Sequence, residues 1–210
     1  MSGLRLIESE SDIAEGAAHL AAVCPVWARV LSRLGPLPLR RREDGFAAIL
    51  GAIVSQQLSV KAAESIARRL AAAGLDRPDS IAAAEDAALR ACGLSGQKVR
   101  YLRGIAGAGL DFDALRGMPD DEVIATLTAL PGIGRWTAEI YLLFALGRAD
   151  AFAPDDLALQ ESARLMYGLP ERPKARALAE LARPWAPWRS VAARGLWAYY
   201  HAAKGREGVT

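Results

Sequence analysis

The apolar positions of this chain are spaced as they are in helices. Apolar residues recur three and four positions apart along most of the sequence, and the alternating apolar–polar runs of half-buried strands are scarce. The pattern predicts helices at residues 12–23, 25–34, 44–57, 59–73, 85–91, 96–108, 119–129, 134–146, 156–167, 173–183 and 188–203. We therefore expect an all-α protein of about ten helices.

Residues at the ends of these segments are typical of helix boundaries. Asp44 and Ser59 are suited to N-caps, because a short polar side chain can accept a hydrogen bond from the free N–H groups of a first turn. Pro119 precedes three acidic residues, as at many helix starts, and Gly147 and Gly168 lie where helices should end. These boundaries support the helical interpretation.

The composition is that of an ordinary globular protein. Of the 210 residues, 52% are hydrophobic and 24% are charged, and no apolar run approaches the ~20 residues that span a bilayer. The N-terminus lacks a basic segment followed by an apolar one, so we expect no signal peptide and a cytoplasmic protein. Cys24 and Cys92 are far apart, which argues against a disulfide framework, a zinc site or a four-cysteine iron–sulfur cluster.

The charge of the chain permits nucleic-acid binding without requiring it. The formal net charge is +2, and basic residues cluster at 40–42, 68–69, 98–103 and 172–176. Each cluster could equally be a solvated surface of a helix. The sequence therefore leaves open which basic residues contact phosphates.

The most informative segment is a hairpin that contains two glycines. Its residues are Leu130, Pro131, Gly132, Ile133, Gly134, Arg135, Trp136, Thr137 and Ala138. Gly132 and Gly134 keep side chains away from the start of the second helix, whose free N–H groups and dipole can then bind an anion such as a DNA phosphate. Arg135 could add a charge-assisted contact. A tight turn between two helices that binds nothing is the alternative.

Residues 130–138 resemble the hairpin of the helix-hairpin-helix DNA glycosylases. Downstream, residues 152–160 resemble the aspartate motif of that superfamily, and residues 53–59 resemble the loop that enters DNA opposite the damaged base. Residues 187–190 and 195–199 resemble the end of the 3-methyladenine DNA glycosylase II branch. The matches extend over residues 45–200, which is most of the chain.

The resemblance implies both a fold and an activity. The fold is a two-lobed helical glycosylase fold with a helix-hairpin-helix motif, in the compact form without an N-terminal β domain. We expect a single domain over residues 1–210, with lobes at approximately 45–130 and at 1–44 plus 131–210. The activity is base-excision repair, by hydrolysis of the N-glycosidic bond of flipped-out alkylated purines such as 3-methyladenine and 7-methylguanine.

The same resemblance assigns the catalytic role to Asp156. A glycosylase flips the nucleotide out of the duplex, and the sugar becomes oxocarbenium-like as the base leaves. A carboxylate stabilises that positive charge and can orient or deprotonate the attacking water. Asp156 begins the predicted helix 156–167, where the dipole stabilises a negative side chain. A plain N-cap role is the alternative, for Asp155 as well as for Asp156.

Three aromatic residues are candidates for binding the base. Trp136 stands where bifunctional members of the superfamily have a lysine, which implies a monofunctional enzyme without lyase activity. Its π-face could bind an electron-poor alkylated purine, a cation–π contact of ~0.5–2 kcal/mol. Trp197 matches a second pocket aromatic, whereas Tyr141 is offset from the family's tyrosine position, which falls at Ile140. Core packing is the alternative for each.

The remaining candidates would contact DNA. Gln57, followed by Leu58, is the candidate wedge that fills the gap left by the flipped nucleotide, with a plain helix–helix turn as the alternative. The hairpin candidates are Gly132, Ile133, Gly134, Arg135 and Thr137.

The resemblance also sets expectations for ligands and location. No side chains indicate a metal site and no cofactor is required, although a monovalent cation at backbone carbonyls near 130–135 is implied. The partner is double-stranded DNA with alkylated bases, and we expect a monomer, no membrane association, and a bacterial-type intracellular protein that acts on the nucleoid. A non-catalytic helix-hairpin-helix DNA-binding module and a glycosylase for deaminated purines are the alternatives, and the preferred base stays open.

Overall fold

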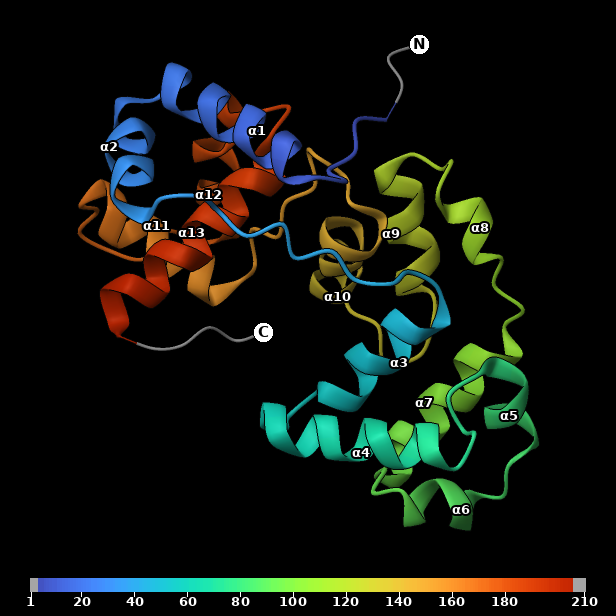
Figure 1. The fold of residues 1–210 in the computed structure, drawn as a ribbon. Helices are drawn as coiled ribbons and strands as arrows, with labels where there is room; N and C mark the ends of the chain where they lie inside the picture. The colour runs from blue at the N-terminus through green and yellow to red at the C-terminus, as the bar shows by residue number, and fades with distance from the viewer. Residues whose placement is uncertain (1–3, 206–210) are drawn as a thin grey trace. The chain divides into compact units, whose positions relative to one another are not determined.

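The described chain is built from helices joined by turns and loops (Figure 1). The computed structural model describes residues 4–205, and no strand forms among them, although Leu6 and Arg148 make an isolated antiparallel bridge. The helices are α1 (Glu10–Val23), α2 (Pro25–Leu34), α3 (Phe46–Ser55), α4 (Val60–Ala72), α5 (Pro78–Ala83), α6 (Asp86–Ala91), α7 (Gly96–Gly107), α8 (Phe112–Leu115), α9 (Asp120–Thr128), α10 (Arg135–Ile140), the π-helix η1 (Tyr141–Leu146), α11 (Leu157–Tyr167), α12 (Ala175–Leu181), the 3₁₀-helix η2 (Arg183–Trp185) and α13 (Arg189–Lys204). The all-α fold class is confirmed.

The chain divides into two compact units. Unit 1 runs to Arg41 and resumes at Leu142, and it contains α1, α2, α11, α12, η2 and α13, drawn in blue, orange and red in Figure 1. Unit 2 is Arg42–Tyr141 and contains α3 to α10. The lobe boundary expected from the sequence falls near residue 131, whereas unit 2 extends to Tyr141 and contains the hairpin at 130–134.

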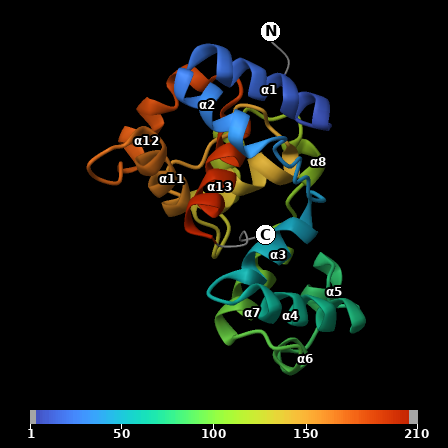
Figure 2. The ribbon, with the colours of Figure 1, turned by 60° about the vertical axis from the view of Figure 1, so that its left-hand side comes forward.

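Unit 1 is built around α13, which packs against α1, α2 and α11 (Figure 2). The buried Ser162 hydroxyl on α11 donates a 2.7 Å hydrogen bond to the Leu196 carbonyl on α13. Gly195 lets the α13 backbone approach α2, because a Cβ there would lie 2.6 Å from Cζ3 of the buried Trp27. These contacts hold the segment of α13 that contains Trp197 in place against α11. The helix α11 begins directly after Asp156.

Unit 2 has α7 at its centre. The helix contacts α3, α5 and α6, and it buries Val99, Leu102 and Ile105. These residues recur at three-residue spacing, as expected for one buried helical face. Around this centre, α3 packs against α4, and α9 packs against α10.

The observed helix ends correct one predicted cap and confirm another. Ser59 is an N-cap, since its hydroxyl accepts a 3.3 Å hydrogen bond from the backbone N–H of Ala62. The prediction that Asp44 caps α3 is wrong. An Asp44 cap would require the helix to begin at residue 45, whereas α3 begins at Phe46 and has Gly45 as its N-cap. The Asp44 carboxylate instead pairs with Arg116, a contact that sequence spacing does not reveal.

Two short helices and one helical irregularity were not predicted. The helices α5 and α8 have 6 and 4 residues, too few to show a clear apolar period. The predicted helix 134–146 ends as an α-helix at Ile140 and continues as a π-helix to Leu146, and the boundary between the units falls within this π-helix.

Candidate functional site

The turn between α9 and α10 contains two glycines with different structural requirements. Gly132 has a φ of 80°, in the left-handed region, and a Cβ there would collide with the ring of Tyr101. Gly134 is the N-cap of α10 with a φ of −90°, and apart from its own chain neighbours and helix backbone no atom of the described residues lies within 4 Å of the position a Cβ would take. The fold therefore requires glycine at 132, whereas nothing in the described residues requires glycine at 134.

The residues at the start of α10 and directly before it include both exposed and buried side chains. Trp136 is 46% exposed, and the Arg135 side chain is 63% exposed while its Nε donates a 2.9 Å hydrogen bond to Oε1 of the buried Glu139. Ile133 and Thr137 are buried. Any DNA contact at these last two positions would use backbone atoms, whereas Arg135 and Trp136 present their side chains to solvent.

The candidate wedge lies in a strained and exposed turn between α3 and α4. Gln57 has a φ of 58°, in the left-handed region that non-glycine residues seldom adopt. Its side chain is exposed, and that of Leu58 is 40% exposed. Strain of this kind persists only where the surroundings fix the backbone, and it is common at functional sites.

Asp156 is held at the N-terminus of α11. Its Oδ1 accepts hydrogen bonds from the backbone N–H groups of Ala158 and Leu159, both at 2.9 Å, and a longer one of 3.4 Å from the indole N–H of Trp197. The preceding loop is also fixed, because the side-chain amide of the buried Gln160 donates a 2.9 Å hydrogen bond to the Pro154 carbonyl. The carboxylate is half-buried and has a defined orientation.

The Trp197 ring packs against a buried aromatic ring, which in turn contacts a buried cation. The rings of Phe144 and Trp197 are 5.5 Å apart, and the Arg194 guanidinium lies 5.0 Å from the centre of the Phe144 ring. Burial, together with the positive charges of Arg41 and Arg40, lowers the pKa of Arg194 to about 10. Its donors reach the carbonyls of Leu39, Leu143 and Ser190. The structure thus brings together Asp156 and Trp197, two of the predicted site residues, within unit 1.

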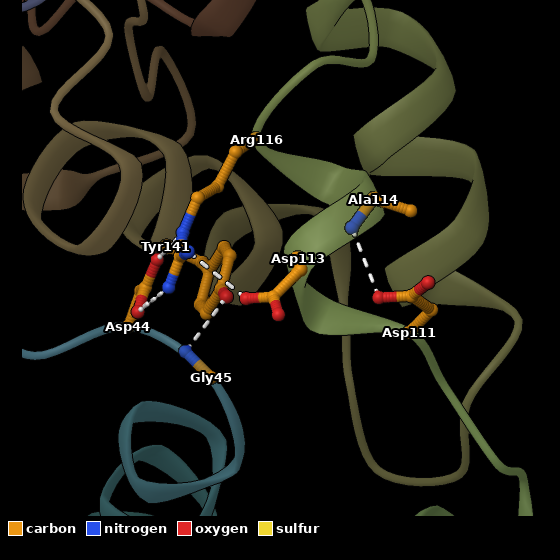
Figure 3. A network of polar contacts seen from close by, with 7 residues as sticks. All are labelled: Asp44, Gly45, Asp111, Asp113, Ala114, Arg116 and Tyr141. Atoms are coloured by element: carbon orange, nitrogen blue, oxygen red, sulfur yellow. Dashed lines mark hydrogen bonds and ion pairs between the residues drawn. The ribbon is translucent and has the colours of Figure 1, made fainter.

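Tyr141 lies in a polar network of unit 2 (Figure 3). Its ring is buried, and its hydroxyl accepts a 3.0 Å hydrogen bond from the backbone N–H of Gly45. Arg116 lies between Asp44 and Asp113, at 2.6 Å and 2.9 Å from their carboxylates. Burial raises the pKa of the Tyr141 hydroxyl. These contacts favour a packing role for Tyr141 over base binding, in line with its offset from the family's tyrosine position.

Sequence reasoning missed the residues that hold the two candidate DNA-binding loops. Gln56 Nε2 donates a 2.9 Å hydrogen bond to the Gly132 carbonyl, and Lys98 Nζ donates 2.8 Å hydrogen bonds to the carbonyls of Val54 and Gln56. In the sequence, Lys98 belonged to one of several basic clusters and Gln56 was one of two adjacent glutamines. No local pattern separates either residue from its neighbours.

Two classes of feature are absent from residues 4–205. These residues hold no group of three or more His, Cys, Asp or Glu side chains that could bind a metal ion. In the same part of the chain, no helix combines the length and the apolar character that crossing a membrane requires.

Comparison with known proteins gives consistent matches. Residues 50–187 match the family model described as HhH-GPD superfamily base excision DNA repair protein. An alkylbase DNA glycosidase-like protein of Schizosaccharomyces pombe is 29% identical over 203 residues, covering 91% of this chain and 95% of its own.

Two solved structures are similar over nearly their whole length. A Schizosaccharomyces pombe 3-methyladenine DNA glycosylase in complex with abasic DNA has a TM-score of 0.75 and 29% identity, covering 90% of this chain and 97% of that one. A DNA-3-methyladenine glycosidase of Bacillus halodurans has a TM-score of 0.81 and 31% identity, covering 96% of this chain and 94% of that one. The similarity is therefore global rather than confined to the hairpin.

Proposed function

The chain belongs to the HhH-GPD superfamily of base excision DNA repair proteins, and on that premise we propose that it is a monofunctional DNA glycosylase for alkylated purines. It hydrolyses the N-glycosidic bond of a flipped-out base of the 3-methyladenine or 7-methylguanine type and leaves the DNA strand intact. The 3-methyladenine glycosylases among its structural neighbours support this choice of substrate.

The observation that carries the proposal is the geometry of Asp156. Backbone N–H groups and the Trp197 indole fix its carboxylate at the start of α11, and a half-buried site screens charge less than water does. A purely structural N-cap needs only the two backbone hydrogen bonds. The tryptophan beside the carboxylate points to a site that accepts an aromatic ligand or substrate.

The chemistry follows from this carboxylate. The bond between C1′ and the base nitrogen breaks, and the bonding electron pair leaves with the base. A cationic 3-methyladenine departs as a neutral molecule, so it needs no general acid. The Asp156 carboxylate stabilises the oxocarbenium-like sugar, a water oxygen bonds to C1′, and the proton that the water loses passes to the carboxylate or to solvent.

Trp136 accounts for two properties of the proposed enzyme, namely the absence of lyase activity and the binding of the alkylated base. It offers no amine to attack C1′, so no covalent Schiff base forms and the strand is not cut. Its exposed indole instead provides a π-face for an electron-poor alkylated base, and cation–π contacts of this kind contribute about 0.5–2 kcal/mol.

The hairpin supplies contacts that do not depend on DNA sequence. The open position beside Gly134 lets a phosphate approach the N–H groups at the start of α10, and the exposed Arg135 adds positive charge nearby. The strained Gln57–Leu58 turn supplies the wedge that replaces the flipped nucleotide.

A monovalent cation at the hairpin is part of the proposal. Backbone carbonyl oxygens are suitable ligands for hard cations, and the carbonyls of Leu130 and Gly132 each accept one hydrogen bond. A carbonyl oxygen has two lone pairs, so each can also ligate a cation. When bound, the cation would supply positive charge beside a DNA phosphate.

The assembly and location follow from the same function. A glycosylase of this size needs one active site and one segment of duplex, so we propose a monomer. Because its substrate is genomic DNA, we propose that it works inside a bacterial-type cell on the nucleoid.

The test is the release of bases from methylated duplex DNA by the wild type and by Asp156→Asn. Asparagine caps a helix as well as aspartate does, so the substitution removes the charge while keeping the cap. We expect the mutant to bind DNA normally but to release 3-methyladenine at least about 100-fold more slowly, equivalent to about 2.7 kcal/mol of barrier. The wild type should leave the strand uncut.

Asp155→Asn is the matched control, since it removes the same charge from the exposed neighbouring residue. It should release bases at the wild-type rate. Release of hypoxanthine but not of methylpurines would change the proposed substrate to deaminated purines. DNA binding by the wild type without release of any base would contradict the proposed activity and indicate a non-catalytic DNA-binding module.

A further inference from the structure

One face of α7 contacts both of the loops that the proposed function places against DNA. Lys98, Tyr101 and Gly104 follow one another at three-residue spacing, which puts them on the same side of the helix. We call these three residues the α7 contact face. Lys98 reaches the turn after α3, whereas Tyr101 and Gly104 lie against the hairpin.

Lys98 binds the end of α3 directly before the candidate wedge. Its Nζ donates hydrogen bonds to the carbonyls of Val54 and Gln56, each at 2.8 Å. The last carbonyls of a helix lack partners within the helix, and an ammonium group satisfies them with charge-assisted hydrogen bonds. Lys98 is half-buried, and burial lowers its pKa. Its ammonium group is therefore directed at the turn rather than at an external phosphate.

The hairpin is held by the other members of the α7 contact face. The Tyr101 ring lies against Gly132, so closely that a Cβ on that glycine would collide with it. Pro131 packs on Gly104, where a Cβ would lie 2.6 Å from Cγ of the proline. The Gln97 side chain donates a 2.5 Å hydrogen bond to the Tyr101 hydroxyl and helps to fix the ring.

Gln56 joins the two loops directly. Its carbonyl accepts the hydrogen bond from Lys98, and its side-chain amide donates to the Gly132 carbonyl at 2.9 Å. Gln57, the next residue, has the left-handed φ of 58°. Gln57, whose backbone is strained, thus directly follows a residue whose carbonyl and side chain are both held by hydrogen bonds.

We propose that Lys98 is a positioning residue for nucleotide flipping. By holding the end of α3 it keeps the Gln57–Leu58 turn in its strained conformation and at a fixed position relative to the hairpin. The wedge is then pre-organised before DNA binds, and its ordering does not add to the barrier of flipping. The inference rests on the proposed glycosylase function, because it assigns the turn a role in flipping.

The experiment compares wild type with Lys98→Met on two substrates under single-turnover conditions with saturating enzyme. One duplex carries the methylated base fully paired, and the other carries it in a bulge, where flipping costs little. We expect Lys98→Met to slow release from the paired duplex about tenfold and from the bulge less than about threefold. The fluorescence of 2-aminopurine beside the lesion should show a matching slowing of unstacking.

Lys61→Met is the matched control, because Lys61 is an exposed lysine in the first turn of α4, close to the same turn. It should release bases from both substrates at the wild-type rate. Lys98→Arg, which keeps the charge and the donors, should recover most of the activity on the paired duplex. If Lys98→Met does not fold, as judged by circular dichroism, Gln56→Met tests the same connection and should show the same difference between substrates.

Each outcome is decisive for the positioning role. Equal slowing on paired and bulged DNA would overturn it, because a general defect in the site affects both substrates alike. Unchanged rates on both would overturn it as well. If the wild type releases no methylpurine from either substrate, the proposed function itself has failed.

Discussion

The two hairpin glycines show how neighbouring residues of one type can serve different purposes. Gly132 combines a φ of 80° with close contact to Tyr101, so the protein's own packing excludes a side chain. Gly134 has a φ of −90° that any residue can adopt, and the described residues leave space for a Cβ. The first glycine is a requirement of the fold, whereas the proposed function assigns the second to the approach of a DNA phosphate.

This difference predicts opposite effects of two alanine substitutions. Gly132→Ala should lower the free energy of unfolding by about 2 kcal/mol or more, because it adds both backbone strain and a collision. Gly134→Ala should change stability by less than about 1 kcal/mol, since the gain in backbone rigidity offsets the poorer cap, but it should weaken duplex binding about tenfold. Urea unfolding and a DNA-binding titration measure the two effects. Wild-type affinity in Gly134→Ala would mean that no phosphate approaches this glycine.

At the scale of single elements, α1 depends on a capping box at its start. The Ser9 hydroxyl accepts a hydrogen bond from the backbone N–H of Asp12, and the Asp12 carboxylate accepts from the backbone N–H groups of Glu8 and Ser9. The hydrogen bond from Glu8, followed by those from the side chain and backbone of Ser9, lowers the pKa of Asp12. The ionised carboxylate is therefore the form that stabilises the helix start.

Asp12→Ala should make this contribution measurable as a pH dependence. Since Asp12 is only half-buried and solvent screens its charge, we expect a loss of less than about 1 kcal/mol at pH 7. A lowered pKa in the folded state gives stability that is full above the unfolded pKa of about 3.9 and is lost as the pH falls through the folded value. The difference between wild type and Asp12→Ala in urea unfolding should therefore shrink below about pH 4.

Glu10→Ala is the control for this pH effect. Glu10 lies in the same first turn and carries the same charge, but the capping box does not use its carboxylate. A pH dependence equal to that of Asp12→Ala would assign the effect to the general charge of the turn rather than to the cap.

At the scale of the whole molecule, the modest net charge of +2 does not by itself explain DNA binding. Binding must depend on where the cations lie, and each phosphate neutralised on duplex DNA contributes about −0.9 to the slope of log affinity against log salt. We therefore expect a steep salt dependence, reduced by about 1 in Arg135→Gln, since Arg135 is exposed at the hairpin. Lys98→Met should leave the slope unchanged, because Lys98 bonds to carbonyls of its own chain.

Binding titrations at several salt concentrations measure this slope, and an affinity that does not change with salt would contradict phosphate contacts altogether.

Repeating the titration at one ionic strength with potassium and with tetramethylammonium tests the hairpin cation. Equal affinity in the two salts would remove the cation from the proposal.

Much of this protein is determined locally and could be predicted from the sequence. The positions of the long helices follow from apolar spacing, and Ser59 caps its helix because capping involves residues only three positions apart. The Gly132–Gly134 turn and the carboxylate at the start of α11 are likewise short-range features. Such features depend on backbone hydrogen bonding between near neighbours, which a linear sequence expresses directly.

The tertiary structure alone decided which distant residues meet. The pairing of Asp44 with Arg116, the burial of Tyr141 and the approach of Trp197 to Asp156 each join residues far apart in the chain. The two hydrogen bonds of Lys98 belong to the same class. Apolar periodicity shows that a helix has a buried face, but it does not show which other helix covers that face. The choice of partner depends on how well side chains fit together and on whether every buried polar group finds a hydrogen bond, and both depend on the whole unit.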